Sequence, residues 1–159
     1  PGITIFNEQG KIIPIVYDIF EVVRKHEAYL ATGHLAPKES IELCREGIKE
    51  GVNMILTHPD WNRTVVPFEL QKEMAGMGVL IEKVWGNVSD DDISREDMAK
   101  SIKLLGSENI FMVTDRGQAG KDLPTKAMLD FIEEMLRQGI TEHGIKTMTI
   151  DNPRKIVEP

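Results

Sequence analysis

The chain has 159 residues, of which 41% are hydrophobic and 28% are charged, and its formal net charge at pH 7 is -7. This length suits one domain. The basic residues are scattered among acidic ones and form no continuous basic surface for a phosphate backbone, so we expect no nucleic-acid partner. No basic-then-apolar leader and no apolar run of the roughly 18 residues that a membrane helix needs is present, so we expect a cytoplasmic protein without membrane contact.

The first 27 residues predict a strand or hairpin followed by a helix. Residues 3–6 and 11–13 are short β-prone runs separated by a polar turn, and a helix is expected from Pro14 to about His26. We expect this segment to begin a single domain that spans residues 1–159.

Residues 28–140 predict four consecutive βα units. The β-rich runs begin near residues 29, 53, 79 and 109, which are 24, 26 and 30 residues apart, and segments with apolar residues every three or four positions lie between them. This spacing suits right-handed crossovers and a parallel sheet. Ser94, with Asp97 three residues on, is typical of a helix start. The single cysteine, Cys44, lies at helical spacing among apolar residues and is expected to be buried.

The last part of the sequence, residues 141–159, predicts a short helix and a tail. The helix is expected over about 141–150 and should stop at Asn152-Pro153, because proline removes a backbone donor and obstructs the preceding turn.

Loop lengths indicate which end of the sheet carries function. The helix-to-strand connections are minimal, whereas the strand-to-helix connections are long and polar. In parallel α/β folds the loops after the strands hold the functional groups. His34, His58 and Asp115 each come first or second after a predicted strand, so we expect their side chains to converge at one edge of the sheet.

Two imidazoles and a carboxylate suit a divalent transition metal, zinc foremost, with manganese, iron or nickel as alternatives. We therefore predict that His34, His58 and Asp115 bind a metal that lowers the pKa of a bound water toward neutrality. Asp115 is also the predicted catalytic base for that water. The alternative is structural: each histidine is a hydrogen-bonded loop residue, and Asp115 caps the next turn.

Other polar and aromatic residues near these strand ends have two interpretations each. Glu82 lies inside the third strand, where an inward charge needs a partner, so it is either a group that supports a ligand or a third carboxylate ligand. Arg116 either binds a carboxylate or phosphate on a substrate or forms a surface ion pair. Trp61 and Trp85 either wall a pocket or pack over the rim of the fold.

Four short motifs occur in a defined order. They are Ala31-Thr32-Gly33-His34, Leu56-Thr57-His58-Pro59, Val113-Thr114-Asp115 with Gly117-Gln118, and Asn152-Pro153-Arg154-Lys155-Ile156. With these motifs nearly the whole chain resembles the C-terminal half of the amidohydrolase-like metal-dependent hydrolases, and more narrowly an uncharacterised branch of that superfamily.

The resemblance implies parallel βα units forming the C-terminal half of a (β/α)8 TIM-type barrel. It implies His34 and His58 as metal ligands after the barrel's fifth and sixth strands, and Asp115 as ligand and base after the eighth. The family's first strand supplies a His-x-His pair and its fourth commonly a lysine, and this chain lacks that half. A complete barrel has about 250 residues, so we expect the half to associate with an N-terminal half on another chain, to assemble with copies of itself, or to be a fragment of a longer protein.

The predicted function is hydrolysis of an amide, ester or lactone in a small-molecule substrate by metal-activated water. The alternative is a non-catalytic half-barrel that acts as an oligomerising or structural module. A doubly wound nucleotide- or flavin-binding domain is disfavoured, because no glycine-rich turn follows the first predicted strand.

Overall fold

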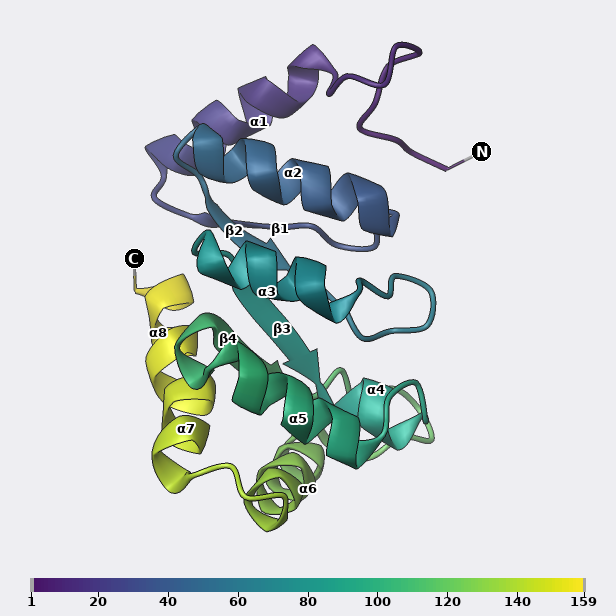
Figure 1. Cartoon of the computed structure of the whole chain (residues 1–159), viewed down its shortest axis with the longest axis vertical. Helices are drawn as coiled ribbons and strands as arrows, with labels where there is room; N and C mark the ends of the chain where they lie inside the picture. Colours follow the sequence, from purple (N-terminus) through teal and green to yellow (C-terminus); the bar gives the residue numbers. More distant parts are fainter. Residues whose placement is uncertain (1, 159) are drawn as a thin grey trace.

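The computed structural model describes residues 2–158, and in this range a four-stranded parallel sheet is flanked by helices (Figure 1). The strands lie in sequence order, β1-β2-β3-β4. Their bounds are β1 (Tyr29–Ala31), β2 (Asn53–Leu56), β3 (Leu80–Val84) and β4 (Ile110–Val113). The α/β class and the parallel pairing predicted from the strand spacing are therefore confirmed.

Of the helices between the strands, α2 (Pro37–Lys49), α3 (Phe68–Gly76) and α5 (Arg95–Leu105) lie along one face of the sheet, in front of it in Figure 1. After β4, the chain continues through α6 and two short C-terminal helices, and the last of these packs against β4. The helical segments are α1 (Pro14–Lys25), α2 (Pro37–Lys49), α3 (Phe68–Gly76), α4 (Trp85–Ser89), α5 (Arg95–Leu105), the 3-10 turn η1 (Ser107–Asn109), α6 (Pro124–Arg137), α7 (Glu142–Lys146), the π turn η2 (Thr147–Asp151) and α8 (Asn152–Val157).

Helix starts follow from local sequence chemistry. Pro14, Pro37 and Pro124 occupy the first turns of α1, α2 and α6, where a missing N–H costs nothing. At α5 the Ser94 hydroxyl accepts a hydrogen bond from the Asp97 N–H at 3.0 Å, which confirms the predicted cap.

The main core lies between the sheet and the helices. Side chains alternate across a strand, so Met54, Ile81 and Met112 face the helix layer and are buried in one apolar cluster. Cys44 belongs to this cluster and is fully buried, and burial raises the pKa of its thiol to about 12. The prediction of a buried cysteine is confirmed.

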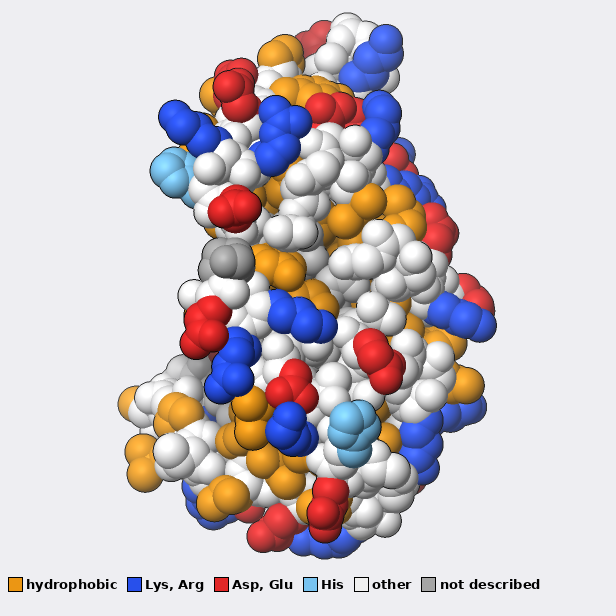
Figure 2. All heavy atoms as spheres, turned by 90° about the vertical axis from the view of Figure 1, so that its left-hand side faces the viewer, with side chains coloured by type: hydrophobic (Ala, Val, Ile, Leu, Met, Phe, Trp, Pro, Cys, Tyr) orange, Lys and Arg blue, Asp and Glu red, His pale blue; other side chains and the backbone are white. Residues whose placement is uncertain are grey.

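The opposite face of the sheet, called here the inner face, is less completely covered. Ile55, Leu80 and Phe111 form a small separate cluster on it, against which Ile156 of α8 packs. Ala31, farther along β1, is exposed. Figure 2 shows that the outline of the molecule is hollowed on this side, away from α2, α3 and α5. The helices therefore seal one face of the sheet and leave the other partly open.

The predictions for the two ends of the chain have different outcomes. At the N-terminus the two predicted runs do pair antiparallel, with one bridge between Phe6 and Ile12 and a backbone hydrogen bond from the Ile13 N–H to the Ile5 carbonyl at 2.9 Å. The final helix does not stop at Asn152-Pro153, because η2 shifts the hydrogen-bond pattern and Pro153 then lies in the first turn of α8, where proline is tolerated. Of the helices within residues 2–158, none is long and apolar enough to cross a membrane.

Candidate functional site

The three predicted site residues lie around one pocket at the carboxyl ends of the strands. His34 follows β1, His58 follows β2 and Asp115 follows β4, and all three line a cavity of about 60 Å³. A cavity of this size has room for an ion or a few water molecules, but not for a whole drug-sized ligand. The remaining lining residues are Trp61, Gly86, Asn87, Asp90, Asp92 and Arg116.

The two imidazoles lie side by side. The ring centroids of His34 and His58 are 5.3 Å apart, and their planes differ by 6°. The Trp61 ring packs against both, at centroid distances of 5.5 Å from His34 and 5.9 Å from His58. Of the two interpretations of the tryptophans, the structure favours the pocket wall for Trp61. Trp85 is instead buried against Phe131 and does not line the pocket.

The backbone is strained where two of these residues leave their strands. His58 has φ 48° and Asp115 has φ 46°, which is the left-handed region that residues other than glycine rarely adopt. Such conformations cost roughly 1–3 kcal/mol each and persist only where the surroundings hold them in place. No feature of the sequence predicted this strain.

Three hydrogen bonds fix the segment that carries His58. The His58 N–H donates to Glu82 Oε2 at 2.9 Å, and the Thr64 hydroxyl donates to the His58 carbonyl at 2.7 Å. The neighbouring Thr57 N–H donates to the Thr32 hydroxyl at 3.0 Å. Glu82 therefore has a partner for its inward-facing charge, which favours the supporting role among its two predicted interpretations.

Burial and the charges around the pocket shift the pKa of Glu82. Burial raises the pKa of its carboxyl above the ordinary value, and the nearby Asp115 carboxylate acts in the same direction. The hydrogen bond from His58 and the charges of His58 and His34 oppose this increase in pKa. His58 Nδ1 lies 3.7 Å from Glu82 Oε2, too far for a hydrogen bond.

Three buried polar side-chain atoms in residues 2–158 have no hydrogen-bond partner: Thr57 Oγ1, His58 Nδ1 and Asn87 Nδ2. His58 and Asn87 both line the pocket. Because buried polar groups in native proteins are nearly always paired, these atoms point to a molecule or ion that is not part of the chain. The sequence predicted no role for Asn87, and its signal there is its position after the third strand.

Arg116 is engaged within the protein, and its side chain is only 6% exposed. Its guanidinium forms an ion pair with Asp90 at 2.8 Å and donates to the Gly86 carbonyl at 3.0 Å and to the Ser89 hydroxyl. A Cβ at Gly86 would lie 3.0 Å from the guanidinium, so this close approach favours glycine. The structure favours the ion-pair interpretation of Arg116 over substrate binding.

The pocket residues fit a metal in kind but are not gathered around one point. In the described part of the chain, no group of three His, Cys, Asp or Glu side chains is arranged to hold a metal ion. The donor set of His34, His58 and Asp115, with Glu82 behind it, is nevertheless the set that zinc and related metals take. The partnerless His58 Nδ1 agrees with that chemistry.

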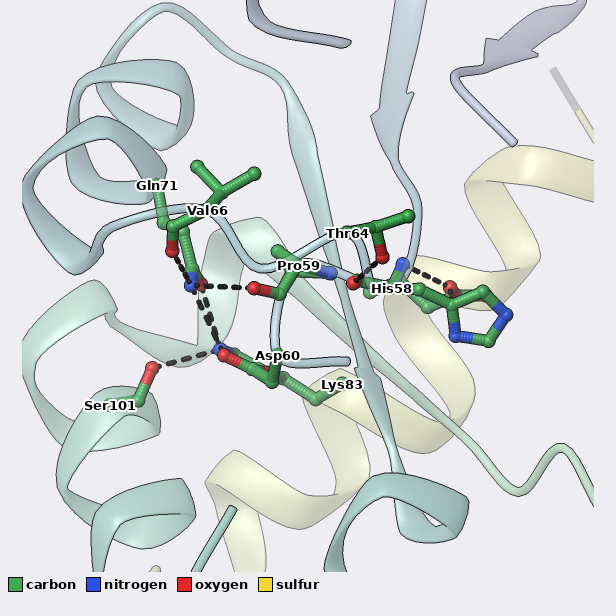
Figure 3. A network of polar contacts seen from close by, with 9 residues as sticks. His58, Pro59, Asp60, Thr64, Val66, Gln71, Lys83 and Ser101 are labelled. Carbon is green, nitrogen blue, oxygen red and sulfur yellow. Dashed lines mark hydrogen bonds and ion pairs between the residues drawn. The ribbon is translucent and has the colours of Figure 1, made fainter. Parts of the chain in front are cut away.

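A second polar cluster lies behind the pocket, on the helix side of the sheet. Lys83 is fully buried, and its ammonium donates to Asp60 Oδ2 at 2.7 Å, Gln71 Oε1 at 2.9 Å and Ser101 Oγ at 2.8 Å (Figure 3). Burial lowers the pKa of Lys83, and the Asp60 carboxylate opposes that decrease. The sequence alone did not predict this cluster, although a lysine within an apolar strand was an available signal.

Comparison with known proteins gives one family. A family of unknown function, DUF6282, matches residues 1–82, which is more than half of the chain and includes His34, His58 and Glu82 but not Asp115. No curated protein matches this sequence. The chain belongs to the DUF6282 family.

Proposed function

We propose that this chain provides the metal site of an amidohydrolase-like, metal-dependent hydrolase. In this proposal His34, His58 and Asp115 hold a divalent transition metal, zinc foremost, with manganese, iron or nickel as alternatives. The observation that carries it is the meeting of two parallel imidazoles and a carboxylate at one pocket, where His58 Nδ1 is buried without a partner.

Asp115, Glu82 and Trp61 have separate roles in this reaction. The metal, when bound, would lower the pKa of a water ligand enough to provide a nucleophile at neutral pH. Asp115, a carboxylate at the edge of the site, would accept the proton of the attacking water. Glu82 holds the His58 backbone through its N–H, and Trp61 shields both imidazoles from solvent on one side.

The pocket also limits the substrate. Its lining carries Asp90, Asp92 and Asp115, and the one arginine there is already paired with Asp90. The lining side chains that the structure describes therefore offer no free cation to hold a substrate anion, and we propose a neutral amide, ester or lactone as the reacting group. Because the cavity is only about 60 Å³, the rest of this small molecule would extend over the open inner face.

We further infer that the four βα units form the C-terminal half of a (β/α)8 TIM-type barrel in a cytoplasmic protein. Support comes from the sequential parallel strand order and from the partly open inner face. Ile15, Ile19 and Val22 are exposed along one side of α1, at the end of the layer where a further helix would pack. A barrel would be completed by an N-terminal half or by another copy of this chain.

The same exposed surfaces favour a second candidate function, a non-catalytic module that assembles through α1 and the inner face. Apolar helix faces and open sheet edges are typical of association surfaces. In that case His34 and His58 would serve only to pack the strand ends, and no metal would be bound.

Metal content and native mass, measured by mass spectrometry on protein purified without chelator, separate the two functions. The hydrolase predicts about one transition metal per chain. It also predicts that His58→Ala loses most of this metal while its thermal midpoint stays within a few degrees of wild type, since His58 is only partly buried. Unchanged metal content in this variant, or a metal-free oligomer of the wild-type chain, would contradict the proposed site.

A further inference from the structure

Glu82 and Lys83, consecutive residues of β3, both bind the loop that follows β2, from opposite faces of the sheet. Because side chains alternate along a strand, Glu82 projects to the inner face and Lys83 to the helix side. Glu82 accepts the His58 N–H, and Lys83 donates to the carboxylate of Asp60, two residues farther on. Figure 3 shows the contact between Lys83 and Asp60, in the segment that follows β2.

The contacts around Lys83 connect this segment to two helices. The Gln71 amide of α3 donates to Asp60 Oδ1 at 3.1 Å and to the Val66 carbonyl at 2.9 Å, while its oxygen accepts from Lys83. Ser101 of α5 accepts the third hydrogen bond of Lys83. All three donors of the ammonium are thus satisfied within the protein.

Stability alone is a weak reason for an ion pair at this position. Lys83 lies on the side of β3 where Ile81 packs into the main apolar core. The cost of removing both charges from water often equals or exceeds their attraction, and well-packed apolar residues in their place are frequently neutral or stabilising. An apolar pair in the same positions would not fix the orientation of the loop, because hydrogen bonds depend on direction and apolar contacts do not.

We propose that the Lys83–Asp60 pair is a positioning pair for the His58 imidazole. Lys83 fixes Asp60 from the helix side and Glu82 fixes the His58 N–H from the inner side, so the strained backbone of His58 is held at both ends of a three-residue span. The ring is then kept parallel to that of His34. The consequence for metal binding rests on the proposed function, but the positioning itself does not.

The test uses Lys83→Met alone and together with Asp60→Asn. The single variant leaves a buried carboxylate without its cation and is expected to lose much stability. In the double variant the charge is gone, and the new amide donates to Gln71 Oε1 or Ser101 Oγ in place of the lysine, so the fold is expected to recover. Lys49→Met, at an exposed ion pair with Glu46, is the matched control.

Histidine NMR spectra of chelator-treated protein report ring positions without any metal. The chain has four histidines, and His26 and His143 are exposed on the surface and serve as internal references. In the double variant we expect the Hε1 resonances of His34 and His58 to move, because their placement beside Trp61 changes, while the two references and the thermal midpoint stay near wild type. Zinc affinity, measured by competition with a chromogenic chelator, is expected to fall about 10- to 100-fold.

Wild-type resonances for His34 and His58 in the folded double variant would overturn the proposal, because the pair would then serve stability alone. Displaced resonances support positioning even if the wild-type chain binds no zinc, and that combination would refute only the proposed function. The Lys49→Met control should change neither the resonances nor the zinc affinity.

Discussion

The two faces of the sheet differ in how completely they are built. On the helix side, Met54, Ile81 and Lys83 are fully buried, and the one charged side chain among them has every hydrogen bond satisfied. On the inner face the apolar cluster is small, Ala31 is exposed, and His58 Nδ1 has no partner. The helix side therefore determines the fold. The inner face and the strand ends keep polar atoms without partners and apolar surface without cover, which a ligand or a further part of a barrel would bind or bury.

The largest expected difference between the faces is in the cost of removing an aromatic ring. Phe131 of α6 is fully buried in the main core, and Phe111 lies in the small inner-face cluster with 8% exposure. We expect Phe131→Ala to lower the free energy of unfolding by about 3–5 kcal/mol and Phe111→Ala by clearly less, because a cavity beside the open face can fill with water. Urea denaturation of both variants measures this difference.

Equal losses for the two phenylalanine variants would contradict this comparison. They would mean that the inner face is as tightly packed in solution as the helix side, as it would be beneath a second copy of the chain. Repeating the denaturation over a range of protein concentrations identifies that case, because stability that depends on association rises with concentration.

A smaller effect is expected from the buried carboxyl of the inner face. The pKa of Glu82 is raised above its ordinary value of 4.5, chiefly by burial. The fold therefore favours the protonated form, so the stabilising contribution of Glu82 is greatest below pH 4.5 and is lost as the pH rises through the raised pKa. Glu82→Gln lacks this titration but keeps an acceptor for the His58 N–H.

We accordingly expect the stability of Glu82→Gln, relative to wild type, to improve as the pH is raised from acid to neutral in the presence of chelator. Denaturation at several pH values measures the difference, and Glu69→Gln, at an exposed position on α3, is the control. A relative stability that worsens with increasing pH would show that the charged carboxylate is favoured in the fold.

The sequence predicted the parts of the molecule that depend on local pattern. Strand spacing predicted the parallel sheet, and the position of His34, His58 and Asp115 just past three strands was enough to predict their meeting at one pocket. The pairing of Lys83 with Asp60 was not predictable in the same way. It joins residues 23 positions apart and depends on which face of β3 the helices cover.

Other features also required the three-dimensional structure. Whether Arg116 was free or paired depended on the close approach of Gly86 in α4 and on Asp90 just after that helix. The continuation of the C-terminal helix past Pro153 depended on the π turn before it, because that turn moves the proline to a position that needs no donor. Local propensity alone favoured a stop at this residue.

The smallest effect is expected at the exposed end of the inner face. Ala31 points to the same side of β1 as Tyr29 and is open to solvent, so Ala31→Arg should change the free energy of unfolding of the chain by no more than about 0.5 kcal/mol. Urea denaturation at low protein concentration measures it. A larger loss that grows with protein concentration would show that another copy covers this face. A change near zero at every protein concentration would show that no other copy covers this face, as is required for a substrate that reaches His34 and His58 across it.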